Sequence, residues 1–404
     1  VFSDIPSMYT KRNYVVDIDM DPLAHASPLT SSTVLPVPVV RRTFSEDNSF
    51  SLPSARSSGI SEEQIESLGE QGYTPGLARA LAESVFQFPL RIWVVDNSGS
   101  MAAPDGNRIV STSRRNDVQV VPCTRWKEIQ ETVQYHAQMA ALLRAPTIFR
   151  ILNDPGINVG PSQFGVADKG ESYIEQDLLV AMDVINNATP GGVTPLARHV
   201  CVIRENISIL SPSLISKGQK VVVVLATDGL PTDENGISNE HLQSDFVEAL
   251  RSLERLPVWL VVRLCTDSEE VVSFYNDIDS QMELNIEVVD DFLKEAKEVH
   301  EHNSWLNYSL PLHRYREMGC HNRLMDLLDE RSLTIGELRE FCVFLFGKDN
   351  FDGASDPAAD FKGFKKLVKS MLESEKEGQV QWDPVKDRML PYVNLKKMEK
   401  QYSP

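Results

Sequence analysis

The chain has 404 residues, of which 42% are hydrophobic and 24% are charged, as is usual for a globular protein. Its 40 basic and 58 acidic side chains give a net charge of −18. This charge argues against general affinity for nucleic acid, which depends on an excess of Lys and Arg. No apolar run approaches the roughly 18 residues that a membrane-spanning helix needs, so no membrane span is expected.

The cysteines and the distribution of charge bear on the compartment and on the partners. Five cysteines are present, an odd number with no Cys-x-x-Cys pair, which is typical of a reducing environment. We therefore expect an intracellular protein, cytoplasmic or organellar; the initial Val is compatible with removal of a targeting segment. Residues 91–290 carry 16 basic and 27 acidic side chains, so most of the acidity lies in the middle of the chain.

The first 59 residues predict an extended or disordered arm. They are rich in Ser and Thr, and prolines interrupt them repeatedly. Asp17, Asp19 and Asp21 offer three alternating carboxylates. Because no predicted strand precedes them, a solvated acidic turn is preferred over a metal site.

Residues 60–89 predict a helical hairpin. Ser61 with Gln64 forms a capping box, and Thr74 followed by Pro75 opens a second helix. This pair of helices resembles the first two helices of a ubiquitin-associated domain. The third helix is missing, and half of a small bundle cannot bury its own core, so ubiquitin binding is not expected. We expect the hairpin to pack on the domain that follows.

Residues 90–302 alternate between strands and helices. Strands are predicted at residues 90–95, 147–152, 164–167, 220–226, 258–264 and 286–289. Helices are predicted at 126–143, 172–185, 195–209, 239–256 and 292–302, with capping boxes at Ser172/Glu175 and, for a further helix, at Thr266/Glu269. This alternation predicts an α/β fold with a doubly wound, mostly parallel sheet flanked by helices.

Oxygen-bearing side chains follow the first of these strands. Asp96, Ser98 and Ser100 form an Asp-x-Ser-x-Ser motif at the carboxyl end of the strand, where ligands bind in doubly wound folds. Carboxylates and hydroxyls suit a hard cation such as Mg²⁺ or Mn²⁺, and the motif has no thiol or imidazole. The motif therefore predicts a divalent-cation site.

Two further pieces occur in order along the chain. Thr194 ends a glycine-led loop that begins at Gly191 and leads into a predicted helix. Asp228 follows the most apolar strand, so it also lies at a strand's carboxyl end. Because each piece stands at the expected boundary of a strand or helix, we expect them to converge on one site.

These three pieces together resemble the metal-ion-dependent adhesion site of a von Willebrand factor A domain, over about residues 90–302. The resemblance implies that Ser98, Ser100 and Thr194 offer hydroxyls directly to Mg²⁺, or to Mn²⁺ or Ca²⁺. It implies that Asp96 and Asp228 act largely through coordinated waters and hydrogen bonds. It also implies that an Asp or Glu of a protein partner completes the coordination shell. All five positions are present in this sequence.

The sequence departs from the simple members of that family after the Ser-Met. Residues 102–125 intervene before the first helix, and strand-like runs at 107–111 and 118–121 predict a β-hairpin. The hairpin would emerge beside the ion and carry Arg114 and Arg115. One hypothesis is that it helps to select an acidic partner; a solvated loop is the alternative.

Residues 303–404 predict a helical extension without strong strands. Thr334 with Glu337 forms a capping box, and residues 361–372 have apolar side chains at helical spacing. Whether this extension is a separate domain is left open. The His and Cys side chains between 300 and 321 fit no regular zinc spacing.

Three functions are compatible with these features. The leading one is a metal-dependent protein-binding module in an intracellular scaffold or assembly. It is preferred because no nucleophile–base pair and no nucleotide-binding motif is visible, so no catalytic residue is predicted. The alternatives are a Mg²⁺-dependent hydrolase that uses the same ion as a Lewis acid, and a structural subunit whose metal site is unused.

Overall fold

The computed structural model describes residues 50–52, 59–111, 118–320, 322–374 and 380–403. The predicted arm therefore lies almost entirely outside the described residues, and so do Asp17, Asp19 and Asp21. At the end of the arm, Phe50 is buried in a core of the α/β domain, and its backbone N–H donates to Asn206 Oδ1 at 3.2 Å. Among the described residues, no helix is long and apolar enough to cross a bilayer.

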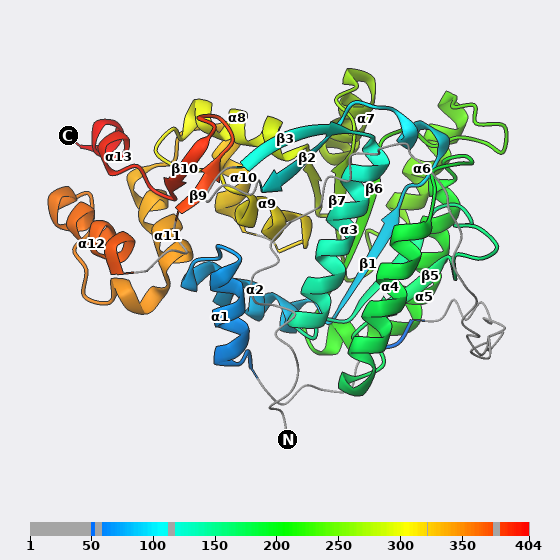
Figure 1. Ribbon diagram of the computed structural model, residues 1–404, viewed down its shortest axis with the longest axis horizontal. Helices are drawn as coiled ribbons and strands as arrows, with labels where there is room; N and C mark the ends of the chain where they lie inside the picture. Colours follow the sequence, from blue (N-terminus) through cyan, green and yellow to red (C-terminus); the bar gives the residue numbers. More distant parts are fainter. Residues whose placement is uncertain (1–49, 53–58, 112–117, 321, 375–379, 404) are drawn as a thin grey trace, which may run out of the picture.

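A six-stranded sheet forms the centre of the α/β domain (Figure 1). Its strands lie in the order β5-β4-β1-β6-β7-β8, and all neighbours are parallel except β5, which is antiparallel to β4. The bounds are β1 Leu90–Val95, β4 Thr147–Ile151, β5 Gln163–Val166, β6 Val221–Thr227, β7 Val258–Leu264 and β8 Ile286–Val289. The predicted doubly wound, mostly parallel sheet is thus confirmed.

Helices cover both faces of the sheet, which explains why its central strands are apolar throughout. In β6, Val221, Val223 and Leu225 enter one core, whereas Val222, Val224 and Ala226 enter the other. The first core is closed by α5 (Leu196–Ser216), α6 (Glu240–Arg251) and α7 (Glu269–Gln281). The second is closed by α3 (Arg125–Leu142) and α4 (Ile174–Asn187).

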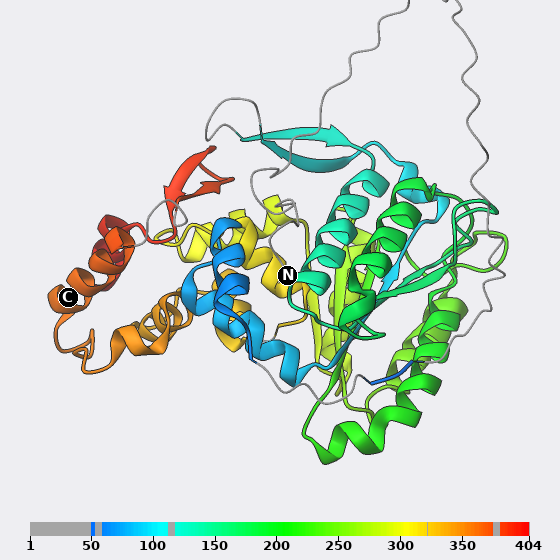
Figure 2. The ribbon, with the colours of Figure 1, turned by 60° about the horizontal axis from the view of Figure 1, so that its bottom comes forward.

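A third core lies beside the sheet and is built from both ends of the chain. It combines the predicted hairpin, α1 (Glu62–Glu70) and α2 (Pro75–Gln87), with the helices that follow β8 (Figures 1 and 2). Those helices are α8 (Phe292–His302), α9 (Leu310–Glu317), α10 (Arg323–Glu330), α11 (Ile335–Phe346), α12 (Phe361–Ser374) and α13 (Leu395–Tyr402). The Thr74 hydroxyl at the start of α2 donates to the Leu345 carbonyl of α11, which fixes the hairpin to the C-terminal helices.

The C-terminal region also reaches the sheet. Arg91 of β1 donates from Nε to the Met318 carbonyl at 3.1 Å, directly after α9. Gly319 has a φ of +69° and lies against Val222 of β6, where any Cβ would overlap the valine side chain. The end of α9 therefore packs on the same face as α3.

Several local predictions differ from the structure. The extension contains a two-stranded hairpin, β9 (Val380–Asp383) and β10 (Arg388–Pro391), where a helical region without strong strands was expected. Helix α5 continues through Pro212 to Ser216 because its last turn buries Leu214 in the core. The capping boxes at Ser61/Gln64 and Thr334/Glu337 are confirmed.

The capping boxes at Ser172/Glu175 and Thr266/Glu269 are wrong. Ser172 lies inside a 3-10 turn, and Tyr173 takes the N-cap of α4. The Thr266 hydroxyl accepts from the Ser268 N–H at 3.2 Å, so the chain turns there and Ser268 becomes the N-cap of α7.

Candidate functional site

The candidate site lies where the strand order of the sheet reverses. From β1 the chain crosses to β4 on one side, and it later returns to β6 on the other side. Asp96 directly follows β1, and Asp228 directly follows β6. Ligands of doubly wound sheets bind at this switch point, outside the carboxyl ends of the strands.

Four of the five predicted site residues form one hydrogen-bonded chain. The Ser98 N–H donates to Asp96 Oδ1 at 2.8 Å, and the Ser98 and Ser100 hydroxyl oxygens are 3.0 Å apart. The Ser100 hydroxyl in turn donates to Asp228 Oδ1 at 2.9 Å. Ser100 lies in a short 3-10 turn over Gly99–Ala102, within hydrogen-bond distance of both Ser98 and Asp228.

The fifth residue, Thr194, is on the adjoining loop. The loop is fastened to the first motif by bonds from Gly191 N–H to the Asn97 carbonyl, at 2.7 Å, and from Gly99 N–H to the Gly192 carbonyl, at 3.2 Å. The Thr194 N–H donates to the Thr232 hydroxyl at 2.8 Å, in the loop that follows Asp228. The three predicted pieces are therefore held together, although they are far apart in the sequence.

Both carboxylates of the site, Asp96 and Asp228, are buried. Asp96 is fully buried and accepts a hydrogen bond from the Thr227 hydroxyl at 2.6 Å. Burial and the neighbouring Asp228 carboxylate raise the pKa of Asp96 to about 6, against the opposing hydrogen bonds from Thr227 and Ser98. Two buried carboxylates of like charge favour the binding of a cation beside them.

Arg125, which the sequence did not mark as a site residue, brings a positive charge to the site. Arg125, the first residue of α3, places Nη1 2.9 Å from Asp228 Oδ2. Its Nε and Nη2 donate to Asp105 Oδ1 and Oδ2 at 2.7 and 2.6 Å. No spacing rule connects Arg125 with Asp228, because the contact depends on where α3 crosses the end of the sheet.

The donor set fits a hard divalent ion. It consists of carboxylates and hydroxyls, without sulfur or imidazole, which is the chemistry of magnesium and manganese sites. Ser98, Thr194 and Asp228 are buried, whereas Ser100 is exposed, so an ion at this place would face solvent on one side. Arg125 already balances the charge of Asp228, so an ion would lie close to a guanidinium.

The predicted β-hairpin is confirmed and lies next to the site. It consists of β2 (Gly106–Ser111) and β3 (Val118–Cys123), which pair antiparallel. Its first strand is fixed to α3, because the Asn107 N–H donates to Glu128 Oε2 at 2.9 Å and Arg108 pairs with Glu131 at 2.9 Å. Figures 1 and 2 show that the hairpin extends from the α/β domain toward the C-terminal helices. Arg114 and Arg115 lie outside the described residues.

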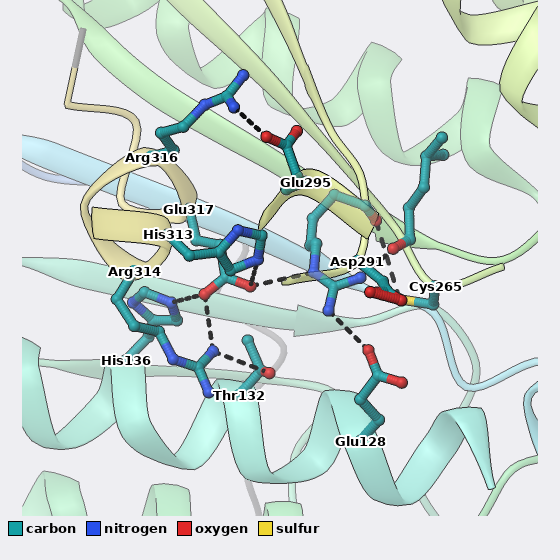
Figure 3. Close-up of polar contacts among 12 residues, drawn as sticks. Glu128, Thr132, His136, Cys265, Asp291, Glu295, His313, Arg314, Arg316 and Glu317 are labelled. Carbon is teal, nitrogen blue, oxygen red and sulfur yellow. Dashed lines mark hydrogen bonds and ion pairs between the residues drawn. The ribbon is translucent and has the colours of Figure 1, made fainter. Parts of the chain in front are cut away.

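A second polar cluster is buried between α3, β7 and α9 (Figure 3). Its centre is Glu317, which contacts His136 Nε2 at 3.1 Å, Arg314 Nη1 at 2.7 Å and Arg263 Nε at 3.0 Å. Burial acts to raise the pKa of Glu317, but Arg314 and the two neighbouring histidines hold it well below its usual value. The cluster is enclosed by the three elements that it joins, which indicates a structural role.

The histidines near residue 300 do not form a metal site in the described part of the chain. There, no group of three or more His, Cys, Asp or Glu side chains is placed to hold a metal ion. His313 faces Glu317, and Cys320 is buried with its Sγ 3.2 Å from Ser84 Oγ.

No family model matches the chain, and no curated protein matches it in sequence. Among solved structures, the chain is similar to a crystal structure described as the SpRpn10 VWA domain. The identity is 12%, the TM-score is 0.28, and the match covers 50% of this chain and 87% of that chain.

Proposed function

We propose that this chain is a divalent-metal-dependent protein-binding module of the von Willebrand factor A type, acting in an intracellular scaffold or assembly. The observation that supports the proposal most strongly is the continuous chain of contacts from Asp96 through Ser98 and Ser100 to Asp228. It lies at the switch point of a doubly wound sheet, and the loop of Thr194 is fastened beside it.

The residues have separate tasks in this proposal. The hydroxyls of Ser98, Ser100 and Thr194 are the direct ligands of Mg²⁺, and Asp96 and Asp228 hold those hydroxyls and the coordinated waters in place. Hydroxyl ligands are neutral, so a bound ion would keep most of its positive charge and an exchangeable position for an Asp or Glu of the partner. The exposure of Ser100 gives such a side chain access.

The metal is tested first, by titrating the full chain with Mn²⁺ and following the free ion by electron paramagnetic resonance. We expect one bound ion per chain, competed by Mg²⁺. Thr194→Ala should lose most of the affinity, and Thr194→Ser, which keeps the hydroxyl, should retain it. Equal binding by both variants would contradict the assignment of Thr194 as a ligand.

The partner is tested next, by affinity capture in Mg²⁺ and in EDTA with the wild type, Thr194→Ala and Asp228→Ala. Partners that are lost on chelation and also in both variants are bound through the ion. Their Asp and Glu side chains can then be replaced one at a time. Persistence of every partner under all conditions would exclude ion-mediated binding.

One observation favours a second function, a structural subunit with an unused metal site. Arg125 pairs with Asp228 and supplies positive charge without any ion. In that case Ser98→Ala and Ser100→Ala would assemble with partners as the wild type does, and neither Mg²⁺ nor EDTA would change the assembly.

A further inference from the structure

We infer that Arg125 is an internal competitor of the cation and that Asp105 weakens this competition by holding the other side of the guanidinium. The inference rests on the proposed function, because it assigns a control of affinity to the same site. Arg125 acts through Asp228 and does not bind the ion, so it is a positioning residue.

The geometry shows one guanidinium shared between two carboxylates in different surroundings. Arg125 Nη1 contacts Asp228 Oδ2 at 2.9 Å, and the Asp228 side chain is completely buried. On the opposite side, Nε and Nη2 bind both oxygens of Asp105, whose side chain is 56% exposed. The bidentate pair with Asp105 offers the guanidinium a partner that remains if the contact with Asp228 is lost.

An ion and Arg125 would compete for the negative charge of Asp228. Asp228 Oδ1 accepts from Ser100, a proposed ligand, and Asp228 Oδ2 accepts from Arg125. An ion held by the serine hydroxyls would stand within a few ångströms of the guanidinium, and like charges repel strongly where protein excludes water. Binding the ion therefore favours movement of the Arg125 guanidinium away from Asp228, while its two bonds to Asp105 remain.

This movement would also affect the hairpin formed by β2 and β3. Asp105 directly precedes β2, and Arg125 begins α3 shortly after β3 ends. The Arg125 N–H also donates to the Ala103 carbonyl at 3.0 Å, so the start of α3 is tied to the loop that leads into the hairpin. Occupancy of the site is thus coupled to the segment that separates this chain from simple members of the family.

Two substitutions test the inference with opposite expected signs. In Mn²⁺ titrations of the full chain, Arg125→Met should bind the ion about tenfold more tightly, because the competing charge is gone. Asp105→Asn should bind it more weakly, roughly threefold, because the guanidinium then interacts with Asp228 alone. Arg251→Met is the matched control, since Arg251 pairs with Glu248 on the surface of α6, and its affinity should equal that of the wild type.

The possible results separate this inference from the proposed function. Tighter binding by Arg125→Met, or binding by that variant alone, supports the inference. Equal binding by the wild type and Arg125→Met overturns it and leaves the proposed metal site standing. If neither binds Mn²⁺, the proposed function itself fails. If circular dichroism shows that Arg125→Met is unfolded, Asp105→Asn decides alone, and unchanged or tighter binding by it overturns the inference.

Discussion

Arg263 of β7 and Glu317 of α9 form a buried ion pair with a distance of 3.0 Å between Nε and Oε1. The exposed fractions of the two side chains are 3% and 0%. Since β7 lies inside the sheet and α9 belongs to the C-terminal helices, the pair joins two parts of the chain across their common interface. His136 of α3 contacts the same carboxylate, so the sheet, its covering helix and the C-terminal region are fastened at one point.

The first prediction concerns this cluster. Glu317→Gln should lower the free energy of unfolding by about 3 kcal/mol, because it removes the buried carboxylate that Arg263 and Arg314 share, while Arg263 keeps its pair with Glu128. The loss is measured from urea unfolding followed by circular dichroism at pH 7. The control is Glu373→Gln, which breaks an exposed pair with Lys369 one helical turn away and should cost less than about 0.5 kcal/mol. Similar losses of unfolding free energy in both variants would show that the buried cluster stabilises the fold no more than an exposed ion pair does.

The second prediction concerns the contact of Gly319 with the sheet. Gly319→Ala should destabilise the chain by about 2–4 kcal/mol, because the new methyl group overlaps Val222 and the φ of +69° is unfavourable for alanine. Gly218→Ala separates the two effects, since Gly218 has a φ of +64° with no atom near its missing Cβ. It should show only the backbone cost, about 1 kcal/mol. Equal losses would exclude the steric contribution.

The sheet could be predicted from the sequence because most of its strands are short apolar runs that alternate with helical segments. Strands β1 and β7 have the predicted bounds, since burial on both faces leaves few polar residues inside each strand. The grouping of Asp96 with Asp228 follows from the same logic. Both residues end parallel strands, and parallel strands that are adjacent place their carboxyl ends together.

The remaining features depend on contacts between distant segments. Arg125 contacts Asp228 because α3 begins next to the carboxyl ends of β1 and β6. Helical periodicity predicts that α3 is a helix but does not predict where it begins relative to the sheet. Strands β9 and β10 have four residues each, and only β9 alternates apolar and polar side chains, so the pattern is too short to identify a strand. Trp382 of β9 packs near Phe292, with ring centroids 6.2 Å apart, and this tertiary contact helps to fix the hairpin.

The third prediction concerns the pH dependence of stability. His199 lies on α5. Its burial and, to a smaller extent, the charge of Arg150 lower its pKa to about 4, whereas an unfolded histidine titrates near 6.5. Below pH 6.5 the unfolded state therefore binds a proton that the folded state does not, so the contribution of His199 is complete above pH 6.5 and is lost as the pH falls toward 4. The difference in unfolding free energy between the wild type and His199→Gln should change by at most about 1.4 kcal/mol per pH unit in that interval.

The measurement is urea unfolding of both proteins from pH 4 to 8. Other titrating groups, such as Asp96, are present in both and cancel in the difference. His241→Gln is the control, because His241 lies on α6 with a side chain that is 83% exposed and pairs only with the surface residue Asp245 among the described contacts. A difference between the wild type and His199→Gln that stays constant with pH would show that His199 is protonated equally in both states.

The last prediction concerns removal of the metal and rests on the proposed function. An ion that binds only the folded chain stabilises it by about 2.7 kcal/mol at a concentration 100 times its dissociation constant. Wild-type protein should therefore unfold at higher urea in Mg²⁺ than in EDTA at equal ionic strength, and Thr194→Ala should unfold at the same urea concentration in both. Asp228→Asn should differ from Thr194→Ala even in EDTA, because it removes the buried charge that Arg125 and Ser100 contact. If Mg²⁺ raises the urea midpoint of the wild type and of Thr194→Ala by the same amount, the ion binds elsewhere on the chain. Removal of the Thr194 hydroxyl would weaken the binding of the ion only at a site that includes that hydroxyl.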